Sequence, residues 1–179
     1  MIDKEAISRK DLFKFIRILR DYTWERNKKR NIILMRLSAQ WISGFTDGEG
    51  CFHIGISKHS QMTTGYQVLP EFIIVQHKRD IKLLYNLKAY FGCGVVRKNK
   101  GSGNIYSYRV RNRAHLMNII IPFFEKHSLK TMKKVDFQKF RKVLLMMERN
   151  EHLTLTGLDA IRKIRRQKSL ISQDRVQPQ

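Results

Sequence analysis

Apolar and polar residues alternate along residues 51–58, and this period of two predicts a half-buried β-strand. Phe52, Ile54 and Ile56 fall on one side of the strand, and polar or small residues fall on the other. Similar short segments recur three more times, with a hairpin loop after the first strand and a glycine-rich turn before the last. The sequence therefore predicts four strands, at residues 51–58, 68–76, 94–98 and 105–111.

Apolar residues recur at helical spacing between and after these strands. Ile81, Leu84, Leu87 and Phe91 form one such pattern, which ends at Gly92. The other predicted helices cover about residues 4–20, 113–126 and 131–149, with a last stretch that follows Gly157 and ends near residue 168. This order predicts an α+β domain around a four-stranded antiparallel sheet. We divide the chain into an N-terminal helical extension with a basic linker, a core, and a C-terminal helix with a basic tail: residues 1–34, 35–150 and 151–179.

Basic residues are in excess along the whole chain, with 36 Lys and Arg against 15 Asp and Glu, a formal charge of +21. A field of that sign attracts polyanions, most commonly nucleic acid, although a ribosomal type of RNA binding or a membrane surface would also explain it. No apolar run is long enough to span a bilayer. Cys51 and Cys93 lack the spacing of a zinc site, so we expect reduced core thiols in an intracellular protein. Acidic residues in the first thirty positions argue against a transit peptide.

Strand alternation predicts which side chains of the sheet face a partner. Val96, Tyr106, Tyr108 and Val110 fall on the inward side of the last two strands. The outward side carries arginine and asparagine, which favour guanine and adenine in the major groove of DNA. A solvated strand face is the alternative for each residue alone, but the total charge favours DNA. The predicted DNA-contacting residues are His53, Ser57, His59, Gln67, Glu71, Ile73, Arg97, Asn99, Ser107, Arg109 and Arg111.

The segment from Trp41 to Gly50 combines an apolar helix with two acidic residues, each followed by glycine. Small residues at Ser43 and Gly44 allow close approach to a neighbouring helix. Asp47 and Glu49 then lie at the helix C-terminus, where the helix dipole already carries negative charge. Two carboxylates in that position predict a compensating cation, of the hard kind that oxygen ligands bind.

This segment resembles the LAGLIDADG motif of homing endonucleases, although Trp41 stands where an aliphatic residue is more usual. Weaker matches follow in order at residues 70–77, 91–94 and 122–125, so the resemblance covers residues 36–150. It implies a LAGLIDADG-type αββαββα domain with a DNA-binding sheet, and site-specific cleavage of double-stranded DNA.

The resemblance also implies roles for individual residues. Glu49 and the carbonyl of Gly48 correspond to the ligands of the catalytic divalent metal, and Gln76 corresponds to a polar residue that orders solvent around the attacking water. The family's active-site lysine falls near Lys130, Lys133 and Lys134; Lys130 or Lys133 is favoured, and the sequence does not separate them.

One Glu49 per chain is too few carboxylates for two metal-dependent centres, one for each DNA strand. We therefore expect a homodimer that uses Mg²⁺ on a pseudo-palindromic duplex, with an interface formed by Trp41, Ser43, Gly44 and Asp47. The alternative is a maturase-like protein that binds intron RNA, or DNA, without cutting. The resemblance implies a gene within a mobile intron or intein of an organelle, archaeon or phage, and the absence of a transit signal favours a mitochondrion or chloroplast.

Overall fold

The computed structural model describes residues 36–99, 101 and 103–167. Helix α2 (Ala39–Glu49) passes directly into strand β1 (Gly50–Lys58), which pairs with β2 (Tyr66–His77). A short 3₁₀ turn (Lys78–Asp80) and helix α3 (Ile81–Phe91) lead to β3 (Val95–Lys98) and β4 (Ile105–Val110). Helices α4 (Arg113–His115), α5 (Ile121–Lys126), α6 (Lys133–Glu148) and α7 (Leu155–Arg166) complete the described part. The predicted helix near residues 4–20, the basic linker and the tail after residue 167 lie outside it.

The four strands form one antiparallel sheet, as the sequence predicts, and the structure gives their order as β1-β2-β4-β3. The register places Phe52 opposite Phe72 and Ile74 opposite Tyr108, so large apolar residues of three strands share one face. Because side chains alternate along a strand, the polar residues between them share the opposite face.

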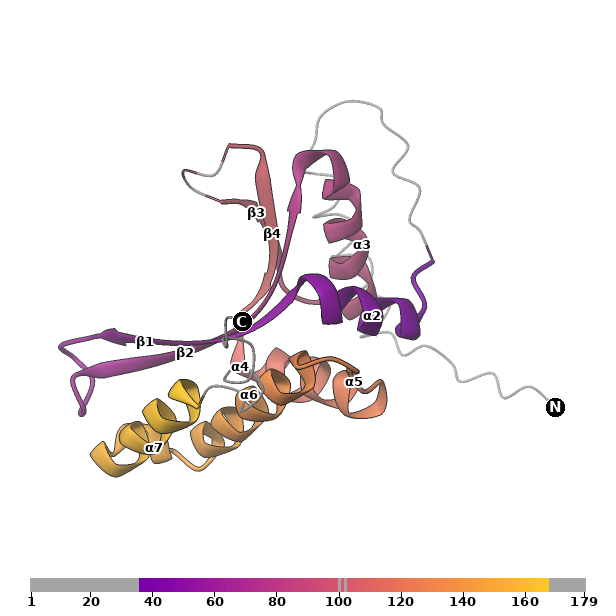
Figure 1. Cartoon of the computed structure of the whole chain (residues 1–179). Helices are drawn as coiled ribbons and strands as arrows, with labels where there is room; N and C mark the ends of the chain where they lie inside the picture. Colours follow the sequence, from indigo (N-terminus) through magenta and orange to yellow (C-terminus); the bar gives the residue numbers. More distant parts are fainter. Residues whose placement is uncertain (1–35, 100, 102, 168–179) are drawn as a thin grey trace, which may run out of the picture.

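The helices pack against one face of this sheet, and the described helices leave the other face open (Figure 1). Phe52 lies at the centre of the contact, with ring centroids 5.2 Å from Phe72 on the sheet, 5.3 Å from Phe124 on α5 and 5.5 Å from Phe140 on α6. Leu84 and Leu87 bury α3 in the same hydrophobic core. Burial of these aromatic and aliphatic side chains holds the helices against the sheet.

Residues 113–126 do not form the single α-helix that periodicity predicts. A π-helical segment (Leu116–Ile120) separates α4 from α5. Pro122 lies in the first turn of α5 and has no N–H to donate to a carbonyl four residues earlier. The wider turn before Pro122 keeps the chain helical across that missing hydrogen bond.

Helix α7 begins before Gly157, not after it as predicted. Thr154 caps this helix by accepting a hydrogen bond from the Gly157 N–H at 3.0 Å. A Cβ at position 157 would lie 1.9 Å from the Glu151 carbonyl oxygen, so this glycine permits a close approach of the chain to itself. Leu158, Ile161 and Ile164 then join the same hydrophobic core as α6. Among the described residues, no helix combines the length and apolar character needed to cross a membrane.

Candidate active site and nucleic-acid interface

The two acidic residues of the motif segment lie at the C-terminal end of α2. Ser38 starts this helix by accepting a hydrogen bond from Trp41 N–H at 3.2 Å, and Glu49 is its last residue. Gly50 turns into β1, and its N–H donates to the Thr46 carbonyl. A Cβ at position 50 would lie 2.4 Å from Thr46 Cγ2, so only glycine allows the helix and strand to meet this closely. Glu49 is thereby held, exposed, at the junction of helix and sheet.

The carboxylate of Asp47 is engaged inside the chain. Its Oδ2 accepts a hydrogen bond from Lys130 N–H at 2.8 Å, and its Oδ1 accepts bonds from Thr131 N–H at 3.1 Å and Thr131 Oγ1 at 2.8 Å. Partial burial by itself raises the pKa of Asp47, but these three donors and the nearby charge of Lys133 together hold it below the ordinary value. Asp47 is therefore satisfied by protein donors, which leaves Glu49 as the carboxylate available to the cation that the sequence predicts.

The same contacts position the start of α6 beside the acidic helix end. Thr131 Oγ1 also accepts a hydrogen bond from Lys133 N–H at 3.2 Å, which links Asp47 to the first residue of α6. The charge of Lys133 acts on the side chains of both Asp47 and Cys51, the residues that flank Glu49 at a distance of two positions. Lys130 contributes its backbone N–H to Asp47, and its side chain is exposed.

We expect Asp47→Ala to lower the free energy of unfolding by about 0.5–2 kcal/mol, the usual cost of removing a side chain that caps backbone N–H groups. The substitution leaves the N–H groups of Lys130 and Thr131 without their acceptor. Denaturant unfolding at neutral pH measures the loss. Asp159→Ala, which breaks an exposed ion pair with Arg162, is the matched control and is expected to change the value by less than about 0.5 kcal/mol. Equal losses in the two variants would contradict a capping role for Asp47.

The oxygen atoms near Glu49 are of the chemical type that a hard divalent cation binds. A free carboxylate and the backbone carbonyl of Gly48 are the oxygen ligands that Mg²⁺ and Ca²⁺ prefer. These ligands are too few for a complete metal site, because the described residues contain no cluster of three or more His, Cys, Asp or Glu side chains that could hold a metal. A complete site therefore requires ligands from outside the described residues, such as DNA phosphates or a second Glu49.

The exposed face of α2 is formed by glycines and one aromatic pair. Gly44 and Gly48 lie one turn apart, and a Cβ built at either position would meet nothing within 4 Å. Trp41, 41% exposed, stacks on Phe45 with ring centroids 4.8 Å apart. Beside Gly44, α2 and the loop at His127–Lys130 enclose a hollow of about 290 Å³. No atom of the described residues lies close enough to Gly44 or Gly48 to keep a second helix away from this face.

Ser43 is not part of that face, which corrects the prediction from the sequence. It is buried at 7% exposure, and its Oγ donates a hydrogen bond to the His127 carbonyl at 2.9 Å. Ser43 thus fastens α2 to the loop that precedes α6. Gly48, which the sequence assigned only to the metal, takes the place of Ser43 as the second small residue of the exposed face.

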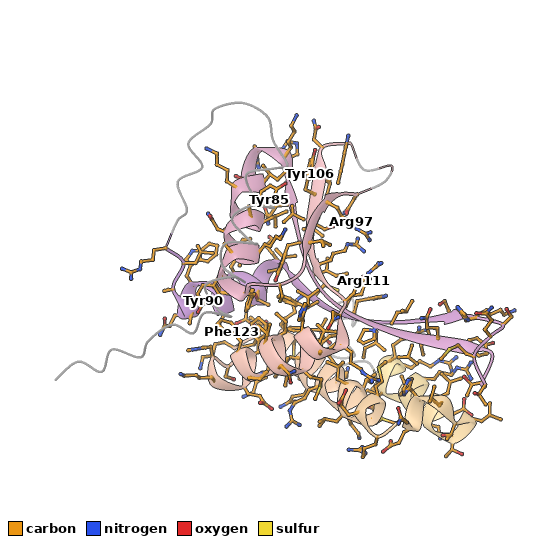
Figure 2. All side chains as sticks on the ribbon, turned by 180° about the vertical axis from the view of Figure 1, so that it is seen from behind. Tyr85, Tyr90, Arg97, Tyr106, Arg111 and Phe123 are labelled. Atoms are coloured by element: carbon orange, nitrogen blue, oxygen red, sulfur yellow. The ribbon has the colours of Figure 1, made fainter. Side chains whose placement is uncertain are left out.

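The open face of the sheet carries most of the residues predicted to contact DNA. Figure 2 shows Arg97 and Arg111 projecting from the side of the sheet opposite α3, with Tyr85 and Tyr90 on the α3 side. His53 and Ser57 of β1 are also exposed. The partly buried members of the set are His59, Gln67, Ile73, Asn99 and Arg109. Gln76, half-buried on β2 opposite Tyr106, lies two residues beyond the Gly50–Ile74 pair.

Glu71 and Ser107 lie on this face, but their side chains are buried and bonded to neighbouring residues, so their direct contact with DNA stays a prediction. Glu71 is 5% exposed and pairs with Arg109 and Arg111. Ser107 is 0% exposed and bonds to Asn99 and Arg109. Alternation places both residues on the correct face, but it does not show that longer side chains from neighbouring strands cover them.

Cys51 is exposed, whereas the sequence analysis placed both cysteines in the core; Cys93 is buried as expected. Cys51 shares the open face with His53, since the two are separated by one period of the strand. Partial burial raises the pKa of the Cys51 thiol, and the positive charge of Lys133 opposes that effect. Sequence reasoning also missed Thr131, which is 84 positions from Asp47 and carries no local signal of that contact.

Comparisons with known proteins agree with this architecture. A family model described as LAGLIDADG endonuclease matches residues 42–144, so the match begins one residue after Trp41. Probable intron-encoded endonuclease 2 of Neurospora crassa is 36% identical over 126 residues, which cover 70% of this chain and 28% of that protein. The chain spans between 23% and 28% of the length of the first curated relatives it matches.

Solved structures give the same assignment. The crystal structure of a homing endonuclease, I-TnaI, is 58% identical with a TM-score of 0.69, over 73% of this chain and 86% of that one. The meganuclease I-SmaMI, bound to uncleaveable DNA, is 29% identical with a TM-score of 0.71, over 93% of this chain and 53% of that one. With the family model matching more than half of its residues, the chain belongs to the LAGLIDADG endonuclease family.

Proposed function

We propose that this chain is a site-specific endonuclease that cuts double-stranded DNA as a homodimer, with Mg²⁺ as cofactor. The observation that carries the proposal is the difference in hydrogen bonding and exposure between the two carboxylates at the end of α2. Three protein donors occupy Asp47, whereas Glu49 is exposed beside the open face of the sheet. An exposed carboxylate on a rigid helix end suits a metal ligand at a DNA phosphate.

Glu49 and the Gly48 carbonyl would hold the divalent cation, which makes a bound water nucleophilic and stabilises charge on the phosphate and the leaving oxygen. Gln76 would orient solvent from the neighbouring strand. The basic and polar residues of the open face would fix the duplex against the sheet through phosphates and base edges. Structures of I-SmaMI bound to cleaved DNA, and to an uncleaved target in the presence of calcium ions, support this assignment by similarity.

A homodimer would supply the second carboxylate. Gly44 and Gly48 leave room for the same face of another copy, as small residues do wherever helices cross closely. A two-fold axis through this face would bring two Glu49 side chains together, one for each DNA strand. Because both copies read DNA in the same way, the target would be pseudo-palindromic.

We assign the active-site lysine to Lys133 and not to Lys130 or Lys134. The charge of Lys133 reaches the residues on both sides of Glu49, and its backbone is tied to Asp47 through Thr131. We expect Lys133→Met to lower the single-turnover cleavage rate by about 10²–10⁴-fold, the usual contribution of a positioned proton-transfer group. Lys130→Met, whose backbone contact to Asp47 is retained, is the matched control and should change the rate less than about threefold. Reversed effects in the two variants would overturn the assignment.

Selection of cleaved sequences from a randomised duplex library in Mg²⁺, with the oligomeric state measured by sedimentation, tests the function directly. We expect one pseudo-palindromic site and a dimer on the DNA. Specific binding without cleavage in any divalent metal would instead identify a binding protein. The relatives that are encoded in introns support an intron-encoded origin for this chain, for which an organelle genome is the favoured location.

A further inference from the structure

A continuous polar network on the open face of the sheet links β2, β4 and Asn99, the residue that follows β3. Glu71 on β2 accepts a hydrogen bond from Arg109 Nη1 at 3.3 Å through Oε2, and it pairs with Arg111 Nε through Oε1. Arg109 Nε donates to Ser107 Oγ at 3.0 Å, and that hydroxyl donates to Asn99 Oδ1 at 2.7 Å. One buried carboxylate and one buried hydroxyl thus hold two arginines and an asparagine.

The strand register makes this arrangement a property of the sheet and not of flexible side chains. Phe72 pairs with Val110 and Ile73 pairs with Arg109, so Glu71 lies at the end of the β2–β4 pair, where Arg111 directly follows β4. Arg109 lies two residues along β4, on the same face and within diagonal reach of Glu71. The side chain of Glu71 is 7% exposed, that of Arg109 21% and that of Arg111 56%. The carboxylate therefore lies beneath the guanidinium groups and cannot itself reach a partner.

The contacts leave donors on each arginine. A guanidinium has five N–H donors in a fixed plane, and the network uses Nε and one terminal nitrogen of Arg109 and the Nε of Arg111. The remaining terminal donors have the geometry that reads O6 and N7 of guanine. Burial, and next the neighbouring charge of Arg97, lower the pKa of Arg109.

We propose that Glu71 is a positioning residue for sequence recognition: it orients Arg109 and Arg111 so that each selects guanine in the half-site. This inference rests on the proposed function, because it assumes that the open face binds a DNA duplex. An arginine that is free to rotate contacts phosphates and several bases alike, whereas one held by contacts from beneath presents its remaining donors in one direction. The donors of Arg109 and Arg111 are therefore oriented for guanine before DNA binds.

Two other roles for Glu71 make different predictions. If the carboxylate only stabilised the fold, its loss would lower the unfolding temperature and weaken binding to all sequences equally. If it acted only as a negative charge near DNA, its loss would raise affinity for all sequences equally. Only a positioning role predicts that loss of Glu71 relaxes the base preference at particular positions of the site and leaves the preference at the other positions unchanged.

The test is a binding selection from a randomised duplex library in buffer without divalent metal, so that cleavage plays no part. The full chain is compared with Glu71→Gln, Ser107→Ala, Arg109→Ala and Arg111→Ala, and the alanine variants of the two arginines identify the base pairs that each arginine reads. Glu125→Gln is the matched control, since it breaks an arginine–glutamate pair with Arg141 on the helical side of the molecule. The unfolding temperature of each variant is measured in parallel.

For Glu71→Gln we expect guanine preference to fall on the order of tenfold at the pairs assigned to Arg109 and Arg111, within the range that one bidentate contact contributes. Preference elsewhere should be unchanged, and non-specific affinity should be equal or higher because a negative charge is removed. Ser107→Ala should relax only the position of Arg109. Glu125→Gln should leave the whole profile unchanged.

A Glu71→Gln profile identical to that of the unmodified chain, or one relaxed equally at every position, overturns the inference. If Glu71→Gln does not fold, Ser107→Ala tests the inference in its place. An unchanged guanine preference at the Arg109 position would then overturn the inference. If the unmodified chain selects no sequence at all, the proposed function itself fails, and this result is distinct from a failure of the positioning role.

Discussion

Glu49→Gln is expected to lower the rate of DNA cleavage by at least about 10³-fold while leaving affinity for the target within about threefold, because the loss of a metal ligand removes several kcal/mol of transition-state stabilisation. Glutamine keeps the size and the carbonyl oxygen of the side chain but not its charge. Single-turnover cleavage in Mg²⁺ and binding in Ca²⁺ measure the two quantities separately. The fold should not suffer, since a carboxylate at a helix C-terminus opposes the helix dipole, and its removal is worth about 0.3–1 kcal/mol in favour of folding.

Glu148→Gln is the matched control, because Glu148 is likewise the exposed last residue of a helix, α6, and pairs with Arg113 away from the acidic end of α2. We expect its cleavage rate to equal that of the unmodified chain. Cleavage by Glu49→Gln at an unchanged rate would show that the active centre lies elsewhere. A loss of binding to the same degree as cleavage would show that Glu49 supports the fold or the docking surface instead of the chemistry.

Gly44→Leu is expected to weaken self-association on the order of 10–100-fold, as over-packing in a close helix contact costs about 1–3 kcal/mol. Inside one chain the new side chain meets no atom near its Cβ, so the folded protomer should remain intact. Gly44→Ala sharpens the test. Replacing a glycine in a helix interior by alanine should stabilise the protomer by up to about 1 kcal/mol, while its methyl group still obstructs the partner helix.

Sedimentation equilibrium measures the association, and denaturant unfolding of the dilute chain measures the protomer. Gln138→Leu, at an exposed position of α6, is the matched control for added apolar surface and should change neither quantity. Cleavage of both strands should fall together with dimerisation in Gly44→Leu. A variant that remains dimeric at the original strength would place the interface on a different surface.

The elements of this fold can be predicted from local sequence pattern. The period of two around Phe52, and the helical spacing that ends at Phe91, locate the strand and the helix because both arise from side chains a few residues apart. Pro122 is the exception: periodicity shows that residues 113–126 are helical, but not how the chain accommodates a missing N–H. The motif itself identifies the acidic helix end.

The internal arrangement of the site cannot be predicted in this way. Asp47 and Thr131 lie 84 positions apart, and Glu71 and Arg109 lie 38 apart. Both contacts depend on the relative placement of whole elements, about which neighbouring residues carry no information. The pattern of acidic residues alone gives Asp47 and Glu49 the same role. The family resemblance assigns the metal to Glu49 and the interface to Asp47, and the fold adds that Asp47 is engaged by protein donors.

Helix α2 and strand β1 share a boundary at Glu49 and Gly50, with no linker between them. The surface proposed to meet a second copy and the surface proposed to meet a duplex therefore belong to one continuous segment, so a change in how two copies meet would also move the end of β1. An engineered single polypeptide that joins two copies of this chain would have to preserve the angle between their α2 helices, even where the outer strands are mutated to recognise new targets.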